Sequence, residues 1–216
     1  MDKIEKETES AKPEQVGSPG AQTLTIQEAL DLGLQHHTAG DLSKAEDIYQ
    51  QILQTDPNHP QVLHLLGVVS HQMGENERAV DLITKALAIK PDFAEAYSNL
   101  GLALQELGRL EEAAASYHKA IDNKPDFPEA YSNLGRALQE LGKPDEAVAS
   151  YKNALTINPR SADVYLSLGV VLRAQEKVDE AVECFNKAKL RLKKKVTLQH
   201  KTYGKFMQMV FCGLCW

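Results

Sequence analysis

Residues 95–117 read EAYSNLGLALQELGRLEEAAASY, and residues 129–151 read EAYSNLGRALQELGKPDEAVASY. The two segments are identical at all but five positions and begin 34 residues apart. A fixed period of this length indicates a solenoid, because a short unit can bury its apolar face only by stacking on its neighbours.

The same period marks five units along the chain. A Leu-Gly pair, an alanine twelve residues after the glycine and a large apolar residue four positions later all recur every 34 residues. The glycines are Gly33, Gly67, Gly101, Gly135 and Gly169, and the large residues are Tyr49, Ile83, Tyr117, Tyr151 and Phe185. Pro57, Pro91, Pro125 and Pro159 close the first four units. In register, the units are 26–59, 60–93, 94–127, 128–161 and 162–195.

Each unit has the pattern of two helices. In the third unit, apolar residues recur at steps of three and four from Ala96 to Leu107, which is typical of one helix face. A second such face runs from Ala113 to Ile121, and Gly108 separates the two. Small residues at the glycine and alanine positions allow close helix packing beside the large ones. We therefore predict an all-α fold, a right-handed superhelix of five helix-turn-helix repeats.

Helix boundaries follow from local signals. Three first helices are preceded by pairs with capping-box spacing, and Pro144 fits the first turn of a second helix. The fifth unit has Glu176 where the other units have a turn glycine. The capping pairs are Thr25 with Glu28, Asp92 with Glu95, and Asp126 with Glu129.

The Leu-Gly pair, the two alanines, the aromatic residue and the closing proline resemble the tetratricopeptide repeat signature. The resemblance covers about residues 26–192 and implies a helical solenoid that holds other proteins. The first unit departs most, with Ala29, His36 and Ile52 at signature positions, as a terminal repeat would. The fifth also departs, at Glu176 and Lys193.

The composition of the flanks differs from that of the repeats. Residues 1–24 are polar and rich in Pro and Gly, which predicts disorder, and the repeats occupy 25–192. Residues 193–216 form a basic and then apolar tail. Residues 1–188 carry 17 basic and 30 acidic side chains, which argues against nucleic acid as the ligand. With three cysteines, no signal peptide and no membrane-spanning stretch, we expect a cytoplasmic protein.

Candidate chemistry is sparse. Cys212 and Cys215 have metal or redox spacing, but there is no second pair to complete a zinc site. His64 and His71 share a helix face without a carboxylate ligand beside them. No phosphate-binding loop, GxSxG or HExxH sequence is present. We predict no enzyme activity, no cofactor and no metal.

Members of the resembled family line the concave side of the solenoid with their first helices. In this chain, the face of each first helix opposite the packed one carries polar groups around an apolar track. Exposed apolar tracks of this kind mark binding surfaces. The predicted groove residues are His64 and Val68; Ser98, Leu102 and Gln105; Ser132, Arg136 and Gln139; and Val170 and Arg173.

Asn99 and Asn133 occupy the same place in successive repeats, beside that face. The arrangement resembles the asparagine ladder in the superhelical arm of O-linked N-acetylglucosamine transferases, whose amides hold a peptide backbone. The other three rungs are Asp31, Leu65 and Ser167, so the match is partial. We expect a non-catalytic scaffold that binds an extended peptide or a partner helix. One alternative is the substrate-recognition arm of such a transferase without its catalytic part. Another is self-association through the end repeats or the apolar tail.

Overall fold

The computed structural model describes residues 24–193, and all regular structure in that range is helical. A tenth helix, residues 178–193, follows α9 and is helical up to the last described residue; we call it the C-terminal helix. The all-α prediction is therefore confirmed for these residues. The labelled helices are α1 (Ile26–Thr38), α2 (Leu42–Thr55), α3 (Pro60–Gln72), α4 (Asn76–Ile89), α5 (Ala94–Glu106), α6 (Leu110–Asn123), α7 (Pro128–Glu140), α8 (Pro144–Ile157) and α9 (Ala162–Ala174).

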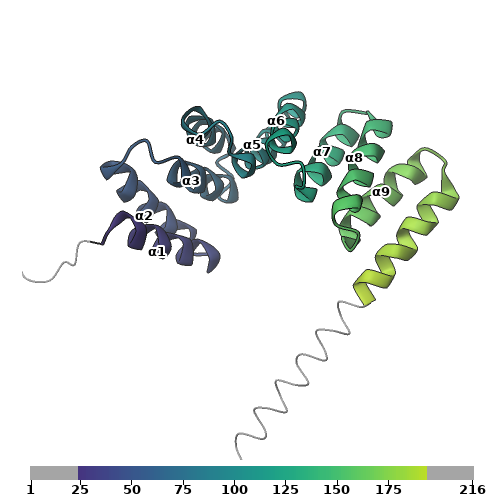
Figure 1. The fold of residues 1–216 in the computed structure, drawn as a ribbon, viewed down its shortest axis with the longest axis horizontal. Helices are drawn as coiled ribbons and strands as arrows, with labels where there is room; N and C mark the ends of the chain where they lie inside the picture. Colours follow the sequence, from purple (N-terminus) through teal and green to yellow (C-terminus); the bar gives the residue numbers. More distant parts are fainter. Residues whose placement is uncertain (1–23, 194–216) are drawn as a thin grey trace, which may run out of the picture.

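The helices pair in chain order and stack into an arch (Figure 1). Each first helix packs against the second helix of its own repeat and against that of the preceding repeat. Successive first helices also touch, α3 with α5, α5 with α7 and α7 with α9. Among the labelled helices, successive second helices are not in comparable contact. The first helices thus occupy the inner, shorter side of the arch.

The pairs are held together by the predicted small-against-large packing. Tyr117 and Ala113 of α6 are fully buried. A methyl group added at Gly101 would lie 2.5 Å from a ring carbon of Tyr117, so only glycine lets α5 approach that ring. Gly135 faces Tyr151 in the same way in the next repeat. The 34-residue period therefore reflects one steric requirement of each helix pair, a glycine facing a large side chain.

The turns between paired helices need a left-handed backbone. In the first four repeats a glycine adopts it, with φ of +71° at Gly108 and Gly142. In the fifth repeat Glu176 adopts φ 62°, a conformation that costs a residue with a Cβ more than glycine. Glu176 therefore forms the same turn as the glycines of the other repeats, but with backbone strain.

One of the three predicted capping boxes is present. Thr25 accepts a hydrogen bond from the Glu28 backbone while the Glu28 carboxylate accepts one from the Thr25 N–H. The predictions at Asp92 and Asp126 are wrong, because the N-cap residues are Phe93 and Phe127, one position later. Pro144 is the first residue of α8, as predicted.

The flanking predictions lie almost entirely outside the described residues. The N-terminal segment and the C-terminal tail, including Cys212 and Cys215, are therefore still predictions. Between residues 24 and 193, no helix is both long and apolar enough to cross a membrane.

Candidate functional site

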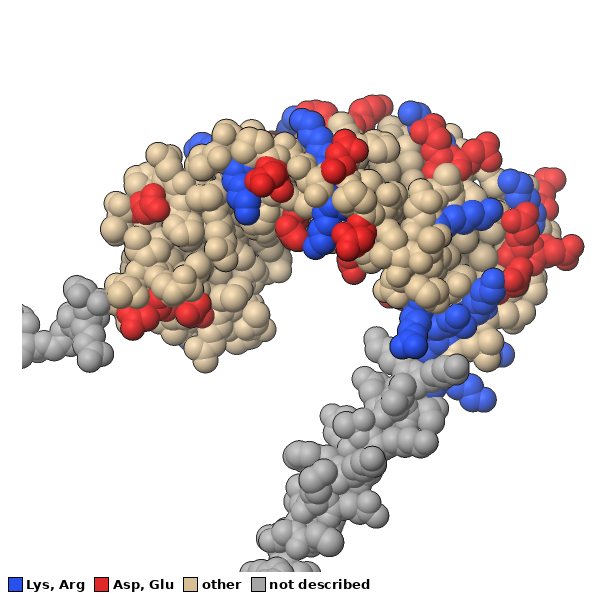
Figure 2. Space-filling view, viewed as in Figure 1, with Lys and Arg blue, Asp and Glu red and all other residues tan. Residues whose placement is uncertain are grey.

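The concave side of the arch is the candidate site. Figure 2 shows the molecule hollowed beneath the arch, on the side formed by the first helices. Each first helix turns the same four or five positions toward this hollow, because the helices repeat in register. What the face can bind depends on which of these side chains remain exposed.

Among the large apolar side chains of the first helices, those of Leu34, Leu166 and Val170 are the most exposed. Leu34 of α1 is 43% exposed, and Leu166 and Val170 of α9 are 39% and 41% exposed. Val68 and Leu102, from the same predicted track, are half-buried, and Leu102 packs against the core. The apolar contact area is therefore greatest at the two ends of the array.

A buried histidine links the second and third repeats. His64 of α3 is 7% exposed, and its ring packs edge-on against Phe93 with 4.6 Å between the ring centroids. Its Nε2 lies 2.7 Å from the side-chain nitrogen of Asn99 on α5. A neutral imidazole can accept this hydrogen bond from the Asn99 amide. The third-repeat rung of the proposed asparagine ladder is therefore already bonded within the protein.

Burial, and not the neighbouring charge, favours the neutral form of His64. Burial lowers the pKa of His64 to about 4, and the Glu95 carboxylate opposes the shift. Glu95 is itself paired with Lys124 at 2.9 Å, and that hydrogen bond is the main cause of its lowered pKa. Lys124 also lies over the Phe127 ring, 4.9 Å from its centroid. This edge of the groove is thus a network in which each charge already has a partner.

Gln105 joins the third and fourth repeats. Its amide oxygen accepts from the Tyr117 hydroxyl at 3.2 Å and from Arg136 at 3.5 Å. Its amide nitrogen donates to Glu140 at 2.5 Å. Since Arg136 and Glu140 lie on α7, this side chain of α5 ties two successive first helices together.

Three of the polar links between first helices share one sequence separation. His37 with Gln72, His64 with Asn99, and Gln105 with Glu140 are each 35 residues apart. This separation is one repeat of 34 residues plus one residue. Each side chain therefore bonds to the residue that follows its own equivalent in the next repeat. The sequence analysis missed these links. A search for complementary polar pairs at this separation would have found them.

The predicted groove residues are therefore of three kinds. His64 and Ser98 are buried and support their neighbours. Asn99, Asn133, Ser132 and Gln105 are half-buried, whereas Arg136, Gln139 and Arg173 are exposed. Within the described residues, the Asn133 side chain makes no hydrogen bond, so its amide is available to a ligand in a way that Asn99 is not.

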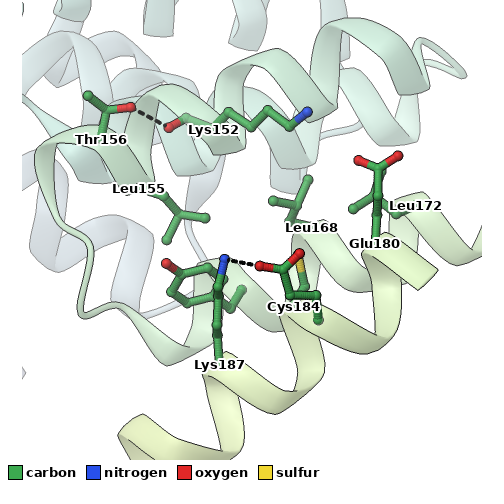
Figure 3. Close-up of a pocket in the computed structure, with 10 residues that line it drawn as sticks. Lys152, Leu155, Thr156, Leu168, Leu172, Glu180, Cys184 and Lys187 are labelled. Carbon is green, nitrogen blue, oxygen red and sulfur yellow. Dashed lines mark hydrogen bonds and ion pairs between the residues drawn. The ribbon is translucent and has the colours of Figure 1, made fainter. Parts of the chain in front are cut away.

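A second hollow, of about 320 Å³, lies between α8, α9 and the C-terminal helix (Figure 3). Its floor is apolar, with Leu155, Leu168 and Leu172, and Lys187 pairs with Glu183 at 2.6 Å across its rim. The polar atoms that are buried without a partner in the described residues belong to α1, α2 and α3, far along the chain from this hollow. Residues 24–193 also contain no group of three His, Cys, Asp or Glu side chains placed to hold a metal ion. The concave face therefore remains the better candidate.

Comparison with known protein families agrees with the architecture. Models described as tetratricopeptide repeat match residues 36–104 and 132–194, and one described as TPR repeat matches residues 105–142. Together these matches span residues 36–194, and the chain belongs to the tetratricopeptide repeat proteins.

Solved structures of MamA proteins are similar to this chain. One is 29% identical, with a TM-score of 0.71 over 77% of this chain and 98% of the other. A second is 28% identical, with a TM-score of 0.69 over 80% of this chain and 94% of the other. MamA of Desulfovibrio magneticus, at 18% identity, shares the fold, with a TM-score of 0.71 over 78% of this chain and 96% of the other. No curated protein matches the sequence significantly.

Proposed function

We propose that this protein is a non-catalytic interaction module that binds an extended peptide or a partner helix along its concave face. The proposal rests on a difference between two sets of side chains on that face. Some polar side chains link successive first helices, while Asn133, Arg136 and the apolar pair Leu166 and Val170 remain available to a ligand.

Preorganisation is the physical basis of this proposal. Binding an extended segment normally costs the entropy of ordering both surfaces. Here, hydrogen bonds across the repeats fix the spacing of the first helices before any ligand arrives. Asn133 can both donate to a backbone carbonyl and accept from a backbone N–H. A ligand held in this way would be recognised largely by its main chain, with apolar side chains seated near α9.

The experiment is a selection of peptides from a random library on the full chain, followed by calorimetric titration of the best binder. Asn133→Ala combined with Val170→Ser should weaken that binder at least about tenfold, because one main-chain hydrogen bond and one apolar contact are lost. Neither side chain supports the core, so helicity and the melting temperature should be unchanged.

The matched control is Asp47→Asn, an exposed change on α2, outside the groove. It should leave the affinity within about twofold. A binder that is weakened by the change at Asp47 and not by the groove changes would place the site elsewhere and contradict the proposal.

The alternative function is the substrate-recognition arm of an O-linked N-acetylglucosamine transferase-like enzyme. The observation in its favour is the placement of Asn99 and Asn133 34 residues apart on α5 and α7. The engagement of Asn99 with His64 shortens this ladder to one available amide. Sequencing of the source transcript beyond Trp216 separates the alternatives, since only the transferase arm requires a catalytic domain in the same reading frame.

A further inference from the structure

The link that Gln105 makes between successive first helices is missing at the last junction of the array. Gln105 of α5 donates to the Glu140 carboxylate of α7, 35 residues later. One repeat on, the equivalent donor is Gln139 of α7, and the residue 35 positions after it is Ala174, the last residue of α9. Helix α7 contacts α9 as α5 contacts α7 (Figure 1). The donor is therefore kept at this junction, while the carboxylate that would accept from it is not.

Two donors at this junction have no acceptor. Gln139 and Arg173 are both exposed, and neither side chain makes a hydrogen bond or ion pair within residues 24–193. They occupy the same position of successive repeats, so they lie at the same level of two neighbouring first helices. Ala174, next to Arg173, is exposed and has no side chain beyond its methyl group. The place that Glu140 occupies one repeat earlier is thus open to a ligand.

The carboxylates near this junction do not neutralise Arg173. Glu140 is engaged by Gln105, and Asp145 of α8 accepts from Gln175 at 2.8 Å. Glu176, in the turn after α9, forms no ion pair with Arg173 in the described part of the chain. An incoming anion therefore meets a guanidinium whose charge is not paired.

A carboxylate suits these two donors better than the other groups of a peptide. It only accepts hydrogen bonds, and its bonds to a guanidinium are strengthened by the opposite charges. The C-terminal ends of α7 and α9 carry a partial negative charge that opposes an anion. Glu140 shows that the fold accommodates a carboxylate at such a helix end when an amide donates to it. At the last junction, Arg173 adds a full positive charge to the amide of Gln139.

We infer that the peptide bound in the groove carries an acidic side chain, whose carboxylate accepts from Gln139 and Arg173 as Glu140 accepts from Gln105. This ligand chemistry rests on the proposed function and adds a side-chain preference to main-chain recognition at Asn133. Val170 lies one turn before Arg173 on α9 and is 41% exposed. The acidic residue of the ligand therefore lies close to the apolar one that Val170 receives.

The first test uses the peptides selected on the full chain, acetylated and amidated so that side chains carry their only carboxylates. We expect every binder to contain Asp or Glu. Replacing that residue by Asn or Gln should raise the dissociation constant about tenfold in calorimetric titration. Binders without an acidic residue, or binders that tolerate this replacement, overturn the inference.

A matched pair of arginine variants locates the carboxylate. Arg173→Gln should weaken the acidic binder about tenfold, and should weaken its amide-substituted form by less than about twofold. Arg160→Gln removes the same charge from an exposed residue that precedes α9, at the opposite end of that helix, and should change either affinity by less than about twofold. Equal effects of the two variants would indicate a general attraction of charge and overturn the assignment to this junction.

Ala174→Glu tests the same place by supplying the carboxylate from within the chain. It should weaken the acidic binder at least about tenfold, because the new side chain competes for Gln139 and Arg173. Ala174→Gln, of equal size and without the charge, should weaken it by less than about threefold. Circular dichroism checks that both variants melt no earlier than the native chain. Equal weakening by both would mean that bulk alone blocks the groove, and would contradict a carboxylate site.

The same titrations separate this inference from the proposed function. If Asn133→Ala with Val170→Ser weakens the binder and Arg173→Gln does not, the acidic group is wrong and the groove is retained. If neither variant weakens the binder, both the groove and its acidic ligand are contradicted.

Discussion

At the scale of single residues, the array depends on contacts that allow almost no extra volume. Ala113 of α6 has no exposed surface, whereas Ala115, two positions later, faces solvent. The two alanines lie on either side of Ala114 in the same helix and have the same helix propensity. They differ in whether another helix packs against them, so comparing them tests the effect of packing.

Ala113→Leu should lower the free energy of unfolding by about 1–3 kcal/mol, because the larger side chain overpacks a helix contact. Ala115→Leu, the same change on the open face, should alter it by less than about 0.5 kcal/mol. Urea denaturation followed by circular dichroism measures both. If the two variants unfold alike, the register of α6 is wrong.

His64 should make stability depend on pH. The pKa of the folded residue is lowered to about 4, while an unfolded histidine titrates near 6.5. As the pH falls, the unfolded chain therefore takes up the proton first. The stabilisation is complete above about pH 6.5 and is lost toward pH 4, by up to about 3 kcal/mol.

The measurement compares melting curves of the native chain and His64→Gln between pH 7 and pH 4.5. Glutamine keeps a hydrogen-bond partner for Asn99 but does not titrate. The difference in stability between the two proteins should shrink as the pH falls. The neighbouring carboxylate of Glu95 and the Lys124 amine are common to both proteins, so a constant difference would contradict the assigned role of His64.

At the scale of helices and turns, the repeats are alike except where a residue breaks the local rule. The turn between α9 and the C-terminal helix requires a left-handed backbone at Glu176, with φ 62°. The equivalent residue of the fourth repeat is Gly142, with φ +71°. The last helix pair therefore carries a strain that its neighbours avoid.

Glu176→Gly should stabilise the chain by about 1 kcal/mol, because glycine adopts this conformation without the steric cost of a Cβ. The reverse change at the matched site, Gly142→Glu, should destabilise it by a similar amount. Thermal unfolding of the two variants beside the native chain gives both values. A loss of stability at Glu176→Gly would mean that the glutamate side chain has a compensating role.

At the scale of the whole molecule, stability depends on how firmly each repeat is coupled to the next. Gln105 carries such a coupling, because it contacts Tyr117 in its own repeat and both Arg136 and Glu140 in the next. Gln139, 34 residues later, makes no side-chain hydrogen bond within residues 24–193. Identical residues at equivalent positions thus have different roles in the array.

Gln105→Ala should lower the free energy of unfolding by about 1–2 kcal/mol, since it leaves the buried Tyr117 hydroxyl without its partner. Gln139→Ala should change it by less than about 0.5 kcal/mol. Guanidinium denaturation also tests coupling, because a weakened junction should broaden the transition for Gln105→Ala alone. Equal effects would show that the link between α5 and α7 contributes nothing measurable.

The amino-acid sequence by itself determined the all-α class, the five repeats and their register. The physical reason is that the information is local and repeated. A glycine must face a large ring, alanines must fill a narrow contact and a glycine must turn the chain, and each requirement recurs every 34 residues. Where a local signal was short and isolated, as at Asp92 and Asp126, the helix began one residue later than the spacing predicted.

Only the tertiary structure decided which groove residues are available. Asn99 and Asn133 occupy equivalent positions of the repeat, so the sequence pattern does not distinguish them. The structure does, because the Asn99 amide bonds to His64, 35 residues away. Likewise, Val148 and Val182 look equivalent in sequence, and one is covered solely because another helix follows it. Exposure and polar pairing depend on contacts between repeats, made by side chains that differ from one repeat to the next. The pattern that the repeats share predicts the fold, but it does not predict these contacts.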